Sequence, residues 1–197
     1  MTPQAESRRT SGGRGRAFGP VLAAVLALFL LAACEEPPTG RYVNDEFDFS
    51  FMPPKGWNFT ASRSDECLVR AEAVKDENCR VYVCVAPRAD NLITMRDDFL
   101  NCEQVKTFVK EQLKGLSVEC GPAHTWRLRA YQAKYLRRVR RGGGVVWQFV
   151  DQKYLIRGAL MFTITAYTLG ETPEAAREVY EQNIYYLSQA MNSLYFR

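Results

Sequence analysis

Four strand-like segments follow one another almost without interruption in the second half of this chain. We expect strands near Thr125–Ala130, Gln132–Arg140, Val145–Tyr154 and Ala159–Thr168, with turns at Gly142-Gly143-Gly144 and at Arg157-Gly158. Connections this short join antiparallel neighbours, because two parallel strands need a crossover of about a dozen residues or more. The second half of the chain is therefore predicted to form an antiparallel sheet.

The segment from Phe47 to Pro87 carries further strand patterns. Phe47-Asp48-Phe49-Ser50-Phe51 alternates strictly, which places three aromatic side chains on one face of a strand. Pro53-Pro54-Lys55-Gly56 ends this strand, and Trp57–Thr60 begins the next one. Leu68–Val74 and Arg80–Pro87 flank a polar turn and predict a hairpin.

Two segments have the apolar period of an amphipathic helix. The first begins either at Thr94, with Asp97-Asp98 in its first turn, or at Asn101, with Gln104 three residues later. The second begins at Thr172-Pro173. The two apolar stripes are Val105, Phe108, Val109, Leu113 and Leu116, and Ala176, Tyr180, Ile184, Leu187, Met191 and Leu194. Hairpin-linked strands with two such helices predict an α+β fold, an antiparallel β-sheet flanked by two main amphipathic helices.

Residues 1–33 have the organisation of an export signal. Four arginines precede a short apolar run from Val21 to Ala33, which Cys34 follows directly. Secretory signals contain ~7–15 apolar residues, whereas a membrane-spanning helix needs roughly 20. Leu31-Ala32-Ala33-Cys34 resembles the cleavage motif of bacterial lipoproteins, and by that resemblance the mature chain begins at a Cys34 that carries diacylglycerol and a further acyl chain such as palmitate. An uncleaved membrane anchor and an ordinary signal peptide cut elsewhere are the alternatives.

The lipid signal predicts both the domain organisation and the location of the protein. Residues 34–41 form a polar, proline-rich tether, and residues 42–197 form a single domain. Two or more acyl chains anchor a protein stably, so we expect a lipid-anchored protein of the cell envelope that faces the periplasm or the exterior. The first 33 residues hold four of the 26 basic residues and one of the 22 acidic residues, so the remainder has a net charge of +1. This charge gives no reason to expect a nucleic-acid partner, and the predicted compartment lacks nucleic acid.

Five cysteines follow Cys34, namely Cys67, Cys79, Cys84, Cys102 and Cys120. In an exported protein they favour disulfides, and an odd number allows at most two bridges with one thiol left over. We prefer the pair Cys67 and Cys84, because a turn near Lys75-Asp76 places them opposite each other on a hairpin. A zinc site that uses Cys79 and Cys84 is the rival interpretation, although no second such pair follows. We expect no metal and no cofactor.

The sequence contains no recognisable catalytic constellation. His124 is the single histidine, and a general base needs a placed partner that its neighbours do not provide. The acidic pairs Asp97-Asp98 and Glu171/Glu174 lie near expected helix starts, where negative charge is favoured. Trp57, Trp126 and Trp147 fall one to a strand, as core or sheet-face residues do. We therefore expect a protein that is not an enzyme.

A cluster of basic residues occupies a segment without acidic side chains, from Gly121 to Val150. On neighbouring strands it would form a positive stripe of Arg127, Arg129, Lys134, Arg137, Arg138, Arg140 and Arg141. One hypothesis is binding of an anionic envelope component or of an acidic protein surface. The other is that edge strands carry basic residues to prevent pairing with other chains.

The opening segment of the domain resembles the PsbP-like family. The resemblance rests on Tyr42, Asn44, Phe47, Phe49, Phe51, Pro53, Pro54, Gly56 and Trp57, and on the closing strand Met161–Tyr167 followed by a helix that ends in Asn192-Ser193-Leu194. It implies a central antiparallel sheet between helices. It also implies binding and assembly support rather than catalysis, since that family has no shared catalytic residues.

Three functional hypotheses follow. The first is a lipid-anchored envelope protein whose domain binds or supports a partner, either an unidentified envelope protein or an anionic envelope component. The second is a carrier or sensor of a small or lipidic ligand held between sheet and helix, which requires a pocket of about 300–1,000 Å³. The third is a hydrolase, which requires Cys102 or Cys120 to lie with His124 and a carboxylate in an open cleft.

Overall fold

The computed structural model describes residues 40–87, 101–125 and 128–197, which form two sheets and two helices. The strands are β1 (Tyr42–Asn44), β2 (Phe49–Phe51), β3 (Asn58–Ser62), β4 (Val69–Asp76), β5 (Cys79–Pro87), β6 (Leu116–Thr125), β7 (Leu128–Arg141), β8 (Gly144–Arg157), β9 (Leu160–Gly170) and β10 (Tyr195–Phe196). The helices are α2 (Cys102–Glu111) and α3 (Pro173–Asn192). Neither helix is long and apolar enough to span a membrane. The predicted signal and Cys34 lie outside the described residues.

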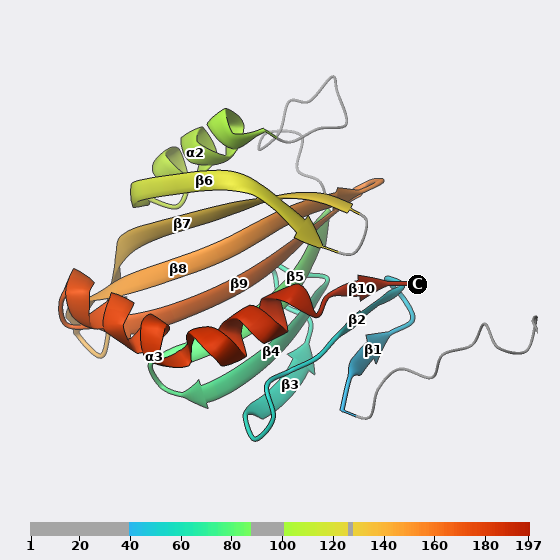
Figure 1. The fold of residues 1–197 in the computed structure, drawn as a ribbon, viewed down its shortest axis with the longest axis horizontal. Coiled ribbons are helices and arrows are strands. Elements are labelled where there is room, and N and C mark those ends of the chain that lie inside the picture. The colour runs from blue at the N-terminus through green and yellow to red at the C-terminus, as the bar shows by residue number, and fades with distance from the viewer. Residues whose placement is uncertain (1–39, 88–100, 126–127) are drawn as a thin grey trace, which may run out of the picture. The chain divides into compact units, whose positions relative to one another are not determined.

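The main sheet has seven strands in the order β3-β4-β5-β9-β8-β7-β6, and every neighbouring pair is antiparallel (Figure 1). This confirms the predicted α+β fold. The turn between β7 and β8 consists of Gly142 and Gly143, which both have positive φ. Two such residues match the twist of a two-residue hairpin, which is why glycines occupy this turn.

The prediction of a strand over Thr125–Ala130 was wrong. Residues 116–125 form the edge strand β6, and a single long strand, β7, begins at Leu128. The apolar spacing of Leu113 and Leu116 extends the predicted first helix too far, because the helix ends at Glu111 and Lys114 has a positive φ. Much of β6 is exposed, so its sequence lacks the alternation of a half-buried strand. The strand also contains Pro122, which is tolerated at the edge of a sheet because one side of an edge strand needs no hydrogen-bond donor.

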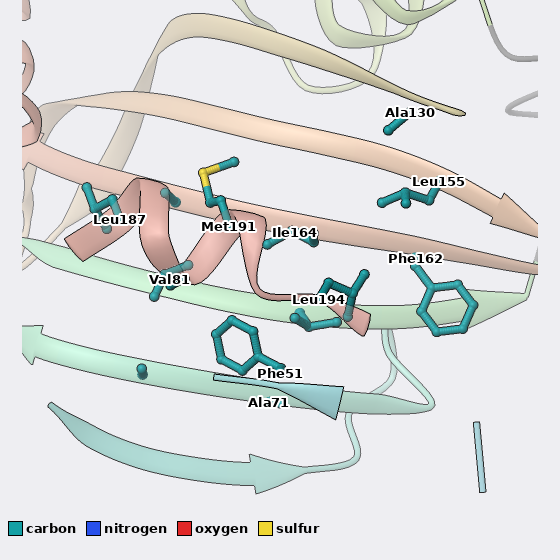
Figure 2. Close-up of a cluster of buried hydrophobic side chains, with 14 of the residues drawn as sticks. Phe51, Ala71, Val81, Ala130, Leu155, Phe162, Ile164, Leu187, Met191 and Leu194 are labelled. Carbon is teal, nitrogen blue, oxygen red and sulfur yellow. The ribbon is translucent and has the colours of Figure 1, made fainter. Parts of the chain in front are cut away.

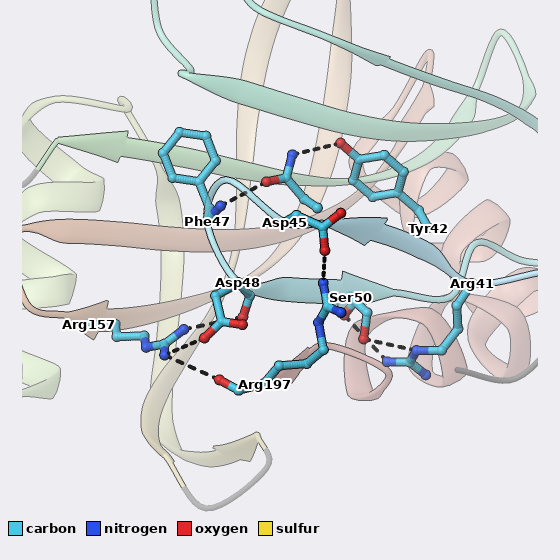
Figure 3. A network of polar contacts seen from close by, with 9 residues as sticks. Arg41, Tyr42, Asp45, Phe47, Asp48, Ser50, Arg157 and Arg197 are labelled. Atoms are coloured by element: carbon cyan, nitrogen blue, oxygen red, sulfur yellow. Dashed lines mark hydrogen bonds and ion pairs between the residues drawn. The ribbon is translucent and has the colours of Figure 1, made fainter. Parts of the chain in front are cut away.

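The predicted strand Phe47–Phe51 is shorter than expected and belongs to a second sheet. The residues before β2 form a turn in which Asp48 has a positive φ, and β1 and β10 pair with β2 on either side. Figure 3 shows Arg157 and Arg197 directed at this turn. Arg157 Nη2 lies 2.8 Å from Asp48 Oδ2, and Arg197 pairs with Asp45. These ion pairs connect the end of β8 and the C-terminus to the first hairpin.

The first helix begins at the later of the two predicted positions. Asn101 caps α2 by accepting a hydrogen bond from Gln104 N at 3.0 Å. The alternative start, Thr94 with Asp97 and Asp98, lies outside the described residues.

Helix α3 begins where the sequence predicts, with Thr172 as its cap and Pro173 in its first turn. Gly170 precedes this cap, and a Cβ atom there would lie 2.4 Å from the backbone nitrogen of Ala176. Within the predicted apolar stripe, Ile184 is 44% exposed, and Asn183 is buried in its place. Lys75 Nζ donates to Asn183 Oδ1 at 2.7 Å, which satisfies that buried amide oxygen.

The main core lies between the sheet and the layer made by α3 and the small sheet. Figure 2 shows Leu187, Met191 and Leu194 of the C-terminal segment against Val81, Phe162 and Ile164 of the central strands. Phe162 also contacts Phe49 and Phe196 edge-on, with ring centroids 5.8 and 4.8 Å away. Phe162 therefore packs the large sheet against strands β2 and β10 of the small sheet.

Side chains that point to the other face of the large sheet alternate with those of the core. Ala133 and Tyr135 of β7 and Val150 and Tyr154 of β8 pack against Val105 and Val109 of α2, and together they form a second, smaller cluster. Helix α2 packs on β6 and β7, at one side of the sheet (Figure 1). A short helix at one side leaves room over the central strands.

We expect Phe162→Ala to lower the free energy of unfolding by about 3–5 kcal/mol, because truncating a fully buried phenylalanine removes apolar contacts and leaves a cavity. Tyr185→Ala is the matched control, since this side chain is 70% exposed and its loss should cost less than about 0.5 kcal/mol. Urea unfolding followed by far-ultraviolet circular dichroism measures both. Equal effects of the two substitutions would contradict this assignment of the core.

Candidate functional site

A cavity of about 600 Å³ lies on the face of the large sheet that α2 partly covers. Its floor comes from β4, β5, β9, β8 and β7, and α2 with the residue that follows its cap supplies one wall. The lining residues are Glu66, Cys67, Arg70, Tyr82, Cys84, Ala86, Pro87, Phe108, Leu113, Tyr135, Arg137, Gln148, Val150, Gln152, Tyr154, Met161, Thr163, Thr165 and Tyr167. Aromatic and aliphatic surface is thus combined with a small set of polar groups.

The α2 wall is fixed by packing and by a disulfide. Cys102, the first residue of α2, is bonded to Cys120 of β6. Gly115 allows the backbone after α2 to pass close to Val109 and Tyr135. A Cβ atom at this position would lie 2.4 Å from Val109 Cγ1 and 3.0 Å from Tyr135 Cδ2. The ring of Phe108 meets Tyr154 edge-on, at 6.2 Å between centroids. Both ends of this wall are therefore attached to the sheet.

A second disulfide closes the opposite side of the cavity. The structure joins Cys67 to Cys84, the pair that the sequence analysis prefers, with 2.07 Å between the sulfur atoms. The hairpin register places Arg70, rather than Cys67, opposite Cys84. Cys67 lies before β4, in a turn where Ser64 and Cys67 exchange backbone hydrogen bonds. The bridge thus attaches this turn to β5.

Gln152 is the centre of the polar floor. Its Oε1 accepts hydrogen bonds from Tyr135 Oη at 3.0 Å and from Tyr154 Oη at 2.7 Å. Burial raises the pKa of both tyrosines above its ordinary value, so the two hydroxyls stay protonated and can donate. The register places Thr165 directly opposite Gln152, and its Oγ1 is buried without a hydrogen-bond partner among the described residues.

Two arginines line the cavity, and they differ in whether a carboxylate of the described residues pairs with them. Arg70 lies 3.2 Å from Glu72 Oε1, and its guanidinium carbon lies 3.9 Å from the centroid of the Tyr82 ring. Arg137 Nε donates to Gln148 Oε1 at 2.6 Å. Within residues 40–87, 101–125 and 128–197, Arg137 forms no ion pair. Among these residues, no carboxylate neutralises its charge at the cavity surface.

The structure does not bring the predicted basic residues together into one stripe. Arg129, Arg137 and Arg141 alternate along β7 with Arg138 and Arg140, so the two sets point to opposite faces of the sheet. Lys134 shares the face of Arg138 and Arg140, and Arg127 lies outside the described residues. Of the members of the predicted set that the structure describes, Arg137 alone lines the cavity.

Most of these arginines contact their own sheet. Arg138 stacks on Trp147 at 4.7 Å, and Arg141 Nη2 lies 3.2 Å from Glu77 Oε2 in the β4–β5 turn. Pairing between β6 and β7 ends at Leu136, so residues 137–141 extend past the edge strand. These residues pair with β8 on one side only, and basic side chains on such an edge segment agree with the edge-protection hypothesis.

The remaining cysteine, Cys79, is buried in the main core. It points to the opposite face of β5 from Cys84, which is in a disulfide, so the rival zinc pair of Cys79 and Cys84 is not formed. Burial raises the pKa of the Cys79 thiol to about 12. Cys102 and Cys120 bond to each other and leave no thiol for the hydrolase hypothesis.

The other candidates from the sequence do not meet at the cavity. His124 is exposed on the edge strand, and Glu171 and Glu174 are exposed at the start of α3. Trp57 and Trp147 are partly buried against the main core, whereas Trp126 lies outside the described residues. In the described part of the chain, no three His, Cys, Asp or Glu side chains are grouped as metal ligands would be.

Several buried polar side chains form hydrogen bonds on the α3 side of the sheet. Tyr180 Oη donates to Asp151 Oδ2 at 2.5 Å, and Gln132 Nε2 donates to Asp151 Oδ1 at 2.6 Å. Lys153 Nζ donates to Asn192 Oδ1 at 2.5 Å, and burial lowers the pKa of this lysine. These bonds attach α3 to β8 beneath the helix.

Known proteins resemble this chain in fold rather than in sequence. No protein-family model and no curated protein matches the sequence. A solution structure of cyanobacterial PsbP, CyanoP from Synechocystis sp. PCC 6803, superposes with a TM-score of 0.57 at 13% identity and covers 84% of this chain and 99% of its own. The domain has a PsbP-like fold.

Two further structures superpose on this chain with lower TM-scores. LpqN, a protein of Mycobacterium tuberculosis involved in cell envelope biogenesis, has a TM-score of 0.42 at 11% identity and covers 74% of this chain and 81% of its own. A protein of Bacteroides thetaiotaomicron has a TM-score of 0.44 at 9% identity and covers 80% of this chain and 48% of its own. The superposition on CyanoP alone therefore establishes the fold of the domain.

Because the Cys79 thiol is buried and its pKa is raised, we expect no reaction of the folded protein with Ellman's reagent at about pH 8. In concentrated guanidinium chloride without reductant, one thiol per chain should react. A Cys34→Ser chain is used so that position 34 contributes no sulfur. Fast reaction of the folded protein, or more than one reactive thiol after unfolding, would contradict this cysteine assignment.

Proposed function

We propose that this protein is a lipid-anchored component of the cell envelope whose domain binds a small or lipidic ligand in the cavity, without chemistry of its own. The cavity itself carries the proposal. Its volume of about 600 Å³ falls within the ~300–1,000 Å³ of typical small-molecule sites. Its lining has the usual composition of such sites, largely apolar and aromatic with a few polar groups.

The arrangement of the side chains supports binding rather than catalysis. Gln152 and the two tyrosines that donate to it are uncharged, and the lining cysteines Cys67 and Cys84 are bonded to each other. A nucleophile needs an adjacent base or a lowered pKa. The buried tyrosines have raised pKa values instead.

The anchor is proposed from the sequence motif at Cys34. A tether from residue 34 to residue 41 would hold the domain near a bilayer and would give the cavity access to lipids or to solutes at the membrane surface. Two or more acyl chains make such attachment stable.

We expect radioactive palmitate to label the native protein in growing cells and to leave a Cys34→Ala protein unlabelled. The substituted protein should also leave the membrane fraction or retain an uncleaved signal. Cys79→Ala is the matched control, since it removes a cysteine that the proposal does not use. Equal membrane retention of Cys34→Ala, together with an unlabelled native protein, would contradict the anchor.

We expect Thr163→Phe to reduce binding of the uncharged probe 1-naphthamide at least about tenfold, because the new ring would occupy cavity volume. Thr60→Phe is the matched control: Thr60 is exposed and lies outside the cavity lining. Equilibrium dialysis against the full chain in phosphatidylcholine nanodiscs, with empty nanodiscs as background, gives the affinities. Equal affinities of the two variants and the native chain, or no binding by the native chain, would contradict the proposed site.

A second candidate function is docking of a protein partner, which a patch on α3 favours. Ile184, Tyr185 and Tyr186 are 44%, 70% and 45% exposed on the outer surface of this helix. Exposed aromatic residues are typical of interaction sites. This function is compatible with ligand binding, since the patch and the cavity lie on opposite sides of the large sheet.

A further inference from the structure

The polar groups of the cavity are unevenly divided between hydrogen-bond donors and acceptors. Gln148 Oε1 is used by Arg137, and Gln152 Oε1 is used by two tyrosines. The amide nitrogens of both glutamines have no hydrogen-bond partner among the described residues, and neither nitrogen is buried out of reach of solvent. Each glutamine therefore presents two N–H donors to the cavity.

The orientation of Gln148 is determined by chemistry. A guanidinium nitrogen can donate but cannot accept, so the oxygen of the Gln148 amide has to face Arg137 Nε, which lies 2.6 Å away. The amide nitrogen then points away from Arg137 Nε. Next to it, Arg137 Nη1 and Nη2 form no hydrogen bond within the described residues. A charged group and a neutral donor thus lie side by side.

Acidic groups do not compensate this cluster. Glu72, which pairs with Arg70, is not part of the lining. Glu66 is the one carboxylate among the described lining residues, and its side chain is exposed in the segment before β4. Arg137 lies on β7, with β8, β9 and β5 between its strand and that segment. The donor-rich end of the cavity is therefore positively charged.

The distance between the two glutamines sets the length of a ligand that would reach both. Gln148 and Gln152 are four residues apart on β8, which corresponds to about 13 Å along a strand. Val150 lies between them on the same face, and Phe108 and Leu113 of the α2 segment provide further apolar lining. An apolar body therefore fits between two polar ends.

We propose that the cavity takes a ligand with an oxyanion, a carboxylate or a phosphate group, bound by Arg137 and Gln148, with its apolar part toward Gln152. This inference rests on the proposed binding function and specifies its ligand class. The anion could belong to a free molecule or to the headgroup of a bilayer lipid, and the two share the recognising chemistry. Arginine suits both groups because its planar fork matches their oxygen atoms.

Equilibrium dialysis of 1-naphthoate and 1-naphthamide tests the inference, because the two probes differ only in a carboxylate against a neutral amide. We expect the native full chain in phosphatidylcholine nanodiscs to bind naphthoate about tenfold more tightly than naphthamide, since charge-assisted hydrogen bonds are roughly twice as strong as neutral ones. Arg137→Gln should abolish this preference, because it should weaken binding of naphthoate about tenfold more than binding of naphthamide.

Arg140→Gln is the matched control. It removes the same charge from the same strand, but Arg140 is exposed and points to the other face of the sheet. Equal binding of both probes by the native chain, or the same loss of naphthoate affinity in both variants, would overturn the oxyanion assignment while leaving the cavity as a binding site. Failure of both probes to bind would overturn the proposed function as well.

The source of the anion is separated by changing the nanodisc lipid. If a bilayer headgroup enters the cavity, phosphatidylglycerol nanodiscs should reduce naphthoate binding by the native chain at least about fivefold relative to phosphatidylcholine. This reduction should be absent for naphthoate binding by Arg137→Gln, which meets the same bilayer charge but lacks the cation that would hold the headgroup. If a free molecule is the ligand, inorganic phosphate added in solution should compete with naphthoate and phosphatidylglycerol should not. Competition by neither would overturn the assignment.

Discussion

The alternation of side chains along β8 and β9 is the constraint on which the rest of the domain depends. Both strands lie inside a seven-stranded sheet, and successive residues point to opposite faces. Phe162 and Ile164 enter the core beneath α3, while Thr163 and Thr165, which alternate with them along β9, line the cavity. A shift of register by one residue would exchange the two sets, so core and cavity are specified together.

The two faces differ because their covers differ in length. Helix α3 has 20 residues and, with the small sheet, covers a continuous apolar layer. Helix α2 has 10 residues and packs at one side of the sheet. Polar residues of β8 that point toward α2, such as Gln148 and Gln152, therefore line open volume, whereas Asp151 and Lys153 on the other face are paired beneath α3.

Features encoded by a few adjacent residues could be predicted from the sequence. The glycine turn at 142–143, the cap at Thr172 and the hairpin that brings Cys67 near Cys84 each have local signals. Edge strand β6 could not be predicted in the same way, because exposure removes its alternation. Strands β1 and β10 have three and two residues and depend on pairing with β2.

The cavity was also beyond local signals. Gln148 and Gln152 lie in a strand buried on both faces, where alternation is lost, and Tyr135 and Tyr154 look like ordinary core residues in the sequence. One available signal was the presence of several polar residues in the predicted strand Val145–Tyr154. Most of the arginine cluster belongs to β7, but side chains alternate along that strand, so Arg137 is the described member that lines the cavity.

Both disulfides close short loops, of 17 and 18 residues in sequence, and both lie at the margins of the cavity. Within the described residues, no covalent bridge crosses the sheet or reaches α3. Among these residues the core is therefore held by packing and hydrogen bonds, while the shape of the cavity also depends on oxidation. Since such bonds persist in oxidising compartments and are reduced in the cytosol, disulfides would hold the cavity walls only in an oxidising compartment. In a reducing compartment the same sheet would carry a cavity whose walls are held by packing and hydrogen bonds alone.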